Sequence, residues 1–125
     1  MNFRIFLFGF IWIGAMFLVF LTPIEDSENL FFECIPARSI IHLALFWGFV
    51  HTWIIACKKQ LKNELFRRRA FTFTFLAAVV LALLSELVMY VTGISTCFNY
   101  WNLIFDLLGS GLGILTFRVL YSSCY

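Results

Sequence analysis

Residues 39–57 decide the fold: they read SIIHLALFWGFVHTWIIAC and hold no charged side chain between Arg38 and Lys58. A helix of about 20 mostly apolar residues crosses the hydrocarbon core of a bilayer. Backbone amides find no water in that core, so a single spanning segment must satisfy them internally, as a helix does. We therefore predict a transmembrane helix over residues 39–57.

Three other runs of similar length have the same apolar character. Each holds at most two charged residues, and the runs are 3–21, 70–92 and 100–121. The first has no small-x-small cleavage site before Thr22, so it fits an uncleaved signal anchor better than a cleaved signal peptide. Together with residues 39–57, these runs predict four transmembrane helices.

The composition of the chain excludes two other classes of protein. Of its 125 residues, 62% are hydrophobic, 20% aromatic and 13% charged. A soluble domain carries about 25% charged residues, and a chain this short cannot hide so much apolar surface from water. A disordered chain is poor in apolar residues and rich in charge. We predict an all-α polytopic membrane protein with one four-helix domain over residues 1–125.

The loops between the predicted spans carry charges of opposite sign. Residues 58–69 hold six basic side chains against Glu64, so the positive-inside rule makes this loop and both termini cytoplasmic. Residues 22–38 hold four acidic side chains against Arg38, and we place this loop outside together with residues 93–99. We interpret the basic run as a topology signal that also meets anionic lipid headgroups, and we predict no nucleic-acid partner.

Three ionisable side chains lie inside the spans at a similar depth. His42, Glu86 and Asp106 are each about 5–10 Å below the external surface at helical rise. Ionisable groups within a span are costly and mark functional sites. With Asn102, one turn from Asp106, they predict an outer-leaflet pocket that binds a ligand. The alternative is that the carboxyl groups only join helices through hydrogen bonds. His51, nine residues from His42, points the opposite way and is interpreted as a packed side chain.

Two of these spans have a patterned face. Asn102, Asp106, Gly109 and Gly113 recur every three or four residues, so they share one helix face. The two glycines form a small-xxx-small element that lets another helix approach closely, within the chain or in a homo-oligomer. In the span 70–92, we expect Glu86 to share its face with Leu83 and Tyr90.

No cofactor is predicted. His42, Glu86 and Asp106 have no local ligand spacing that would support a metal site. The cysteines leave two alternatives. Cys34 and Cys97 both lie in predicted outer loops and could form a disulfide in an oxidising compartment, or all the cysteines are unpaired.

Three segments resemble the VanZ-like family of small bacterial membrane proteins. They are 39–42 SIIH, 85–89 SELVM and 98–113 FNYWNLIFDLLGSGLG. Met89 stands where the family usually has Gln, and Thr96 where it often has Arg. The founding member is associated with resistance to the glycopeptide antibiotic teicoplanin. The resemblance implies a multi-pass protein of the bacterial cytoplasmic membrane with a role in the cell envelope.

Several functions are compatible with these residues. The first is binding of a lipid-linked or glycopeptide-like envelope molecule through Glu86, Asp106, Asn102 and His42, with membrane lipids as neighbours. The second is an enzyme acting on such a lipid, for which Glu86, Asp106 and His42 are the candidate catalytic residues. A proton-coupled transporter is disfavoured because the acidic residues lie away from the midplane, where transporter sites usually sit. A structural subunit of a membrane complex is the remaining alternative.

Overall fold

The computed structural model describes residues 3–22, 37–60, 63–93 and 100–122, with side chains of the second range described from Ser39 onward. The described residues form helices and no strand. The helices are α1 (Phe3–Leu21), α2 (Ala37–Lys58), α3 (Glu64–Arg68), α4 (Ala70–Val91) and α5 (Tyr100–Tyr121). Four of them are long and apolar enough to cross a membrane, which confirms the predicted all-α fold with four spans. Their bounds lie within two residues of the predicted ones.

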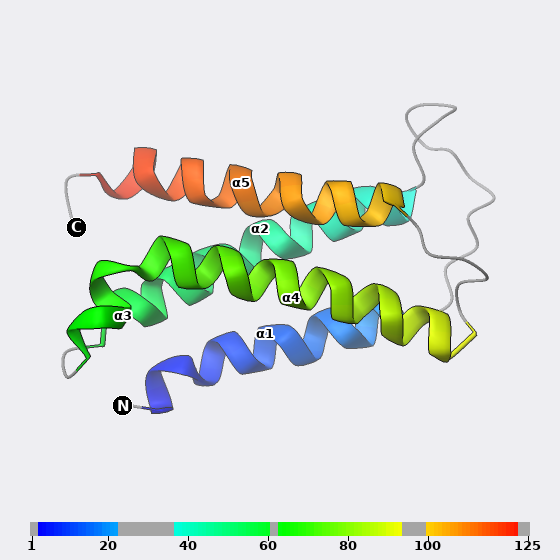
Figure 1. Cartoon of the computed structure of the whole chain (residues 1–125), viewed down its shortest axis with the longest axis horizontal. Helices are drawn as coiled ribbons and strands as arrows, with labels where there is room; N and C mark the ends of the chain where they lie inside the picture. Colours follow the sequence, from blue (N-terminus) through cyan, green and yellow to red (C-terminus); the bar gives the residue numbers. More distant parts are fainter. Residues whose placement is uncertain (1–2, 23–36, 61–62, 94–99, 123–125) are drawn as a thin grey trace.

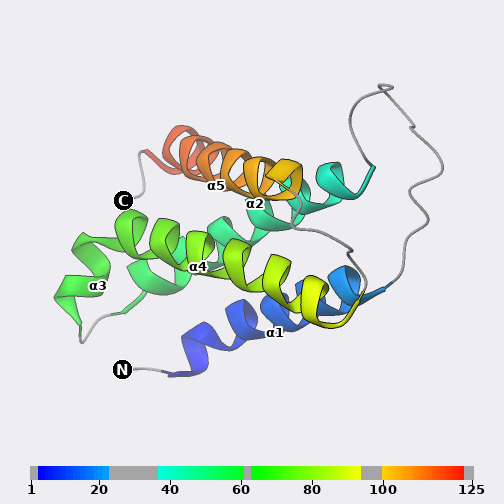
Figure 2. The same ribbon diagram turned by 45° about the vertical axis from the view of Figure 1, so that its right-hand side comes forward.

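The four long helices form an elongated bundle in which the chain runs up and down (Figures 1 and 2). The start of α1, the end of α5 and the short α3 lie at the same end, which we call the Lys58 end. The opposite end, where α1 and α4 finish and α2 and α5 begin, is the His42 end. Which end faces the cytoplasm stays a prediction from charge.

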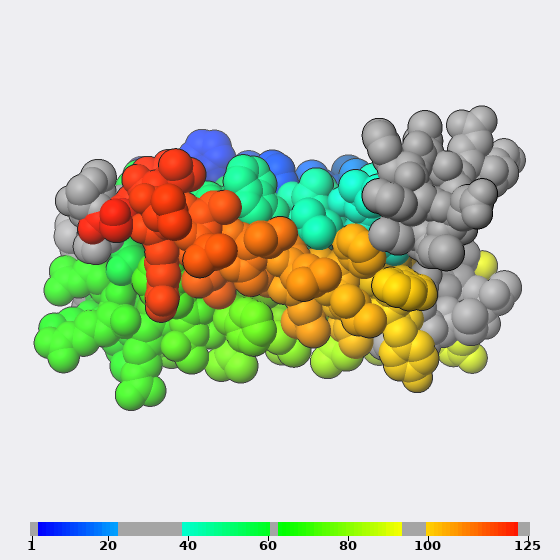
Figure 3. All heavy atoms as spheres, turned by 90° about the horizontal axis from the view of Figure 1, so that it is seen from above, coloured from blue at the N-terminus to red at the C-terminus, as the bar shows by residue number. Residues whose placement is uncertain are grey.

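Helix α2 is the centre of the bundle, since it contacts every other helix and makes its most extensive contact with α5. These two helices run in the same direction (Figure 1). The core is built largely from Phe, Met and small side chains, and its buried residues are Met16, Phe20, Phe46, Phe49, Val50, Ile54, Ala78, Ala82, Met89 and Phe117. Helix α5 covers one side of the bundle along its length, and its outer face is apolar (Figure 3).

Two glycines of α5 set the close approach to α2. A Cβ atom added at Gly109 would overlap the carbonyl oxygen of Leu43, and one at Gly113 would lie 2.9 Å from the Cβ of Val50. Such contacts are possible only without side chains on the α5 side. The small-xxx-small element therefore packs within the chain, against α2.

The short helix α3 was not among the predicted elements. It lies in the basic segment between the second and third spans and includes an ion pair between Arg68 and Glu64, four residues apart. Phe66 packs against Phe73 of α4, with ring centroids 4.8 Å apart. A helical turn brings Glu64 and Arg68 together because they are four residues apart. This ion pair and the contact of Phe66 with Phe73 explain the extra helix.

Candidate functional site

The centre of the candidate site is a bond between His42 of α2 and Asp106 of α5. The imidazole Nδ1 lies 2.7 Å from the carboxyl oxygen Oδ1, and both side chains are fully buried. A distance this short is typical of a charge-assisted hydrogen bond. The two residues face each other because the helix backbones approach closely beside them. Gly109, one turn after Asp106 in α5, lies against the backbone of Leu43, the residue after His42 in α2.

A second bond joins the same helices one turn closer to the His42 end. The hydroxyl of Ser39 donates to the side-chain carbonyl of Asn102 over 2.9 Å, and both residues are buried. The spacing from Ser39 to His42 in α2 matches that from Asn102 to Asp106 in α5, since three or four residues make one turn. The two bonds thus form consecutive rungs between parallel helices. Ser39 was missed from the sequence, although its position one turn before His42 could have indicated it.

Glu86 brings a third helix to the site. Its side chain is 1% exposed, and its carboxyl group interacts electrostatically with that of Asp106. The expected face of α4 was wrong, because Leu83 and Tyr90 are exposed. Glu86 is buried on the side of Ala82 and Met89. A helix turns about 100° per residue, so Leu83 and Tyr90 lie on one side of Glu86 and Ala82 and Met89 on the other. Only the packing of α4 against its neighbours decides which of these two sides is buried.

The polar residues lie at one depth. His42 comes five residues after α2 begins, Asp106 six residues after α5 begins, and Glu86 five residues before α4 ends. These separations place all three about 8–9 Å from the ends of their helices. The structure therefore brings together His42, Glu86, Asn102 and Asp106, the four residues proposed from the sequence as ligand-binding groups.

Helix α1 closes the site with an aromatic ring. Phe20 stacks on the imidazole of His42 with ring centroids 4.1 Å apart and an interplanar angle of 17°. Phe20 also stacks against Phe46 of the core. Nothing in the local sequence indicated this contact, because the two rings come from different helices and one Phe among seventeen carries no distinguishing signal.

The bond between His42 and Asp106 leaves one polar atom of each side chain buried and without a hydrogen-bond partner among the described residues. They are Nε2 of His42 and Oδ2 of Asp106. Leaving a buried polar group unsatisfied costs roughly 1–3 kcal/mol, so each of these atoms calls for a partner such as a water molecule, an ion or a group of a ligand. When Asp106 is ionised and His42 is neutral, Nδ1 of His42 donates to Asp106 and Nε2 carries a lone pair. This is the arrangement that orients an imidazole as a general base.

His51 belongs to a separate polar cluster nearer the middle of α2. Its Nδ1 lies 2.9 Å from the carbonyl of Trp47, and its Nε2 lies 3.3 Å from the hydroxyl of Thr116. The indole of Trp47 donates to the same hydroxyl over 3.1 Å. His51 and His42 therefore both reach α5, at different levels, so the expectation that the two side chains point in opposite directions was wrong. His51 is hydrogen-bonded at both nitrogens, as a packed side chain would be.

The predicted cysteine pairing cannot be placed, since Cys34 and Cys97 lie outside the described residues. Cys57 is buried and unpaired. Within the described ranges, no group of three His, Cys, Asp or Glu side chains is arranged to hold a metal ion.

Comparison with known proteins adds no relative. No family model, curated protein or solved structure matches the chain. The resemblance to the VanZ-like family therefore stays a prediction from short motifs, and the site must be interpreted from its own geometry.

Proposed function

We propose that the protein binds the polar headgroup of a lipid-linked cell-envelope molecule between α2, α4 and α5 at the His42 end. The observation that carries the proposal is the pair of buried atoms, His42 Nε2 and Asp106 Oδ2, that lack a hydrogen-bond partner among the described residues. The positive-inside rule predicts that this end faces outward, in the outer leaflet, and the VanZ-like motifs imply that the membrane is a bacterial cytoplasmic membrane. The VanZ-like motifs favour the same class of ligand.

The charge of the site limits which chemical groups the bound headgroup can present to it. An incoming phosphate would meet the carboxyl groups of Glu86 and Asp106, and like charges in a buried site repel strongly. Both unpartnered atoms, Nε2 of His42 and Oδ2 of Asp106, accept hydrogen bonds when His42 is neutral and Asp106 ionised. The site therefore suits hydroxyl, amide or amine groups, as in a sugar or peptide headgroup. The apolar outer faces of the helices suit the lipid tail.

Native mass spectrometry of the full-length protein tests this proposal. The probe is a polyprenyl-linked disaccharide peptide, with phosphatidylcholine as the competing lipid. We expect the wild type to retain the probe. In Asp106→Asn and His42→Gln, retention should fall about tenfold, which corresponds to the loss of one hydrogen bond of roughly 1–2 kcal/mol.

The matched control is His51→Gln, which changes the same residue type on the same helix outside the site. It should retain the probe as the wild type does. Equal retention by all four proteins, or no retention by the wild type, contradicts the proposal.

A second candidate function is acid–base hydrolysis of the same headgroup by water. The observation in its favour is the Asp106–His42 bond, which leaves Nε2 of a neutral His42 without a partner and so available as a base. Incubating the probe with the protein and measuring released fragments by mass spectrometry tests it. Turnover that His42→Gln abolishes while probe retention persists would promote this function, and a probe recovered intact from the wild type rejects it.

A further inference from the structure

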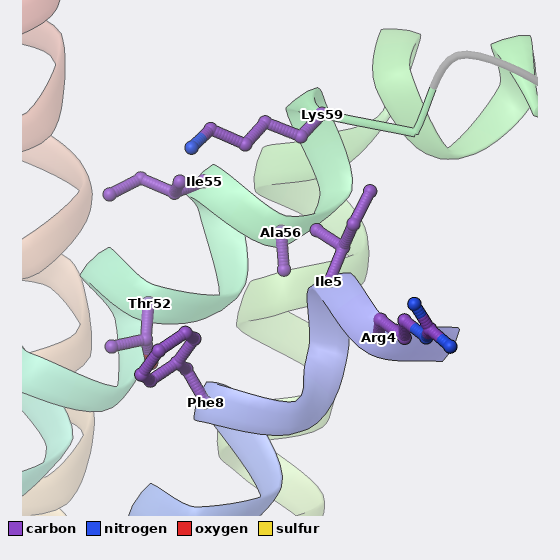
Figure 4. A pocket seen from close by; sticks show the side chains of 7 residues that line it. All are labelled: Arg4, Ile5, Phe8, Thr52, Ile55, Ala56 and Lys59. Carbon is purple, nitrogen blue, oxygen red and sulfur yellow. The ribbon is translucent and has the colours of Figure 1, made fainter. Parts of the chain in front are cut away.

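A groove between α1 and α2 at the Lys58 end lies far from the site already described. It encloses about 380 Å³, within the range of roughly 300–1,000 Å³ found for small-molecule sites. Figure 4 shows its lining, which combines two cations with mostly apolar side chains: Arg4, Ile5, Phe8, Thr52, Ile55, Ala56 and Lys59.

The two cations stand at the mouth of the groove. Arg4 is the second residue of α1, and Lys59 directly follows the last residue of α2. They come from the two helices that border the groove, and their charged ends point to opposite sides in Figure 4. The ion pairs among the described residues involve neither of them, and no lining residue is acidic. The positive charge of the groove is therefore not balanced by its own walls.

The apolar part of the groove extends from the cations into the membrane region. Phe8 lies one turn beyond Arg4 in α1, and Thr52 lies two turns before Lys59 in α2. At helical rise these separations correspond to about 6 and 10 Å. Ala56 is buried between the helices, with Ile5 and Ile55 beside it. The groove is thus charged at the membrane boundary and apolar below it.

We propose that this groove binds an anionic phospholipid. Its phosphate lies at the Lys58 end of the groove, where the long side chains of Arg4 and Lys59 can turn toward it, and the start of an acyl chain lies against Phe8, Ile5 and Ile55. Basic pockets between transmembrane helices bind anionic headgroups in this way, and the exposed face of the groove opens toward lipid. A second copy of the chain is a poorer occupant, because it would bring further cations from the same basic end.

The test measures lipid bound to purified full-length protein by native mass spectrometry, with phosphatidylglycerol and phosphatidylcholine of identical acyl chains. The variant Arg4→Gln/Lys59→Gln removes the charged mouth. We expect it to lower the preference for phosphatidylglycerol by about thirtyfold, given the worth of each basic residue at an anionic surface. The control Arg67→Gln/Arg69→Gln removes two exposed charges from the same end outside the groove and should keep the preference.

A second variant tests the apolar part independently. Ile55→Trp keeps both cations and fills the groove, so it should also displace phosphatidylglycerol, while circular dichroism shows the wild-type helix content. An equal loss in the two double variants would assign the preference to general surface charge and overturn the proposal. An unchanged preference in both groove variants would overturn it too. A third result would also overturn the proposal: a wild-type protein that shows no lipid preference but forms a dimer, which Ile55→Trp converts to monomer. The groove would then bind a second copy of the chain.

Discussion

Among the described residues, each end of the molecule has a short contact between an acidic and a basic side chain, and the two pairs differ in almost everything except distance. At the His42 end, His42 and Asp106 lie 2.7 Å apart and are fully buried. At the Lys58 end, Arg68 and Glu64 lie 2.6 Å apart, with 76% and 59% of their side chains exposed. The first joins two long helices, whereas the second joins residues four apart in one short helix.

The difference shows why contact distance alone says little about an ion pair. Water and salt screen an exposed pair, so it contributes roughly 0–1 kcal/mol to stability. A buried pair has already lost its hydration, so removing one partner leaves an uncompensated polar group. Burying polar groups inside the bundle at the His42 end therefore costs free energy of folding, which is the expected arrangement for a functional site. At the Lys58 end the charges of Arg68 and Glu64 stay exposed, and we predict that the basic residues there set the topology and meet lipid headgroups.

The largest effect should follow from removing the acid of the buried pair. We expect Asp106→Ala to lower the free energy of unfolding by about 3 kcal/mol or more, because the imidazole of His42 is left buried without its partner. Unfolding in detergent micelles, followed by circular dichroism as SDS is added, measures this. The double variant His42→Ala/Asp106→Ala should cost less than the sum of the single variants. Additive costs would show that the two side chains are not coupled.

The next effect concerns the glycine that holds the two rungs in place. Gly109→Ala puts a methyl group against the carbonyl oxygen of Leu43, and we expect a loss of about 1–3 kcal/mol in stability from overpacking. Gly111→Ala is the matched control in the same helix, because its added Cβ meets nothing within 4 Å. The control should be neutral or gain up to about 1 kcal/mol from helix propensity. Equal behaviour of the two variants in the same SDS titration contradicts the close approach.

The sequence predicted those parts of the fold that the bilayer dictates. Lipid fixes the length of each span and forbids most charges within it, so the limits of 3–21 and 100–121 could be read directly. The stripe from Asn102 to Gly113 gave the inward face of α5 because polar and small residues recur at helical spacing.

The rest depends on contacts between helices, for which one sequence has no periodic signal. The side of α4 that buries Glu86 follows from packing against α2 and α5, and the expected partners Leu83 and Tyr90 proved to be exposed. The stacking of Phe20 on His42 likewise requires knowing which turn of α1 meets which turn of α2. Depth in the membrane is thus readable from the sequence, whereas rotation of each helix about its axis is not.

A smaller effect is expected at the outer rung of the His42 end. Ser39→Ala removes the donor to Asn102, and hydrogen bonds between transmembrane helices average about 0.6 kcal/mol with a maximum near 1.7. We expect a loss within that range in the SDS titration, with probe retention reduced less than in Asp106→Asn. A loss as large as that of Asp106→Ala would show that the two rungs form one cooperative unit.

The smallest effect should come from the exposed pair. We expect Glu64→Gln to change the free energy of unfolding by less than about 0.5 kcal/mol, since the Arg68 partner is simply returned to water. The change should shrink further at high salt, because screening acts on exposed charges and hardly on buried ones. The same salt series on Asp106→Ala should leave its large cost almost unchanged. A salt-independent cost for Glu64→Gln would mean that Glu64 is held by more than the local pair. The contrast between the two ends would then lie in helix packing rather than in burial of charge.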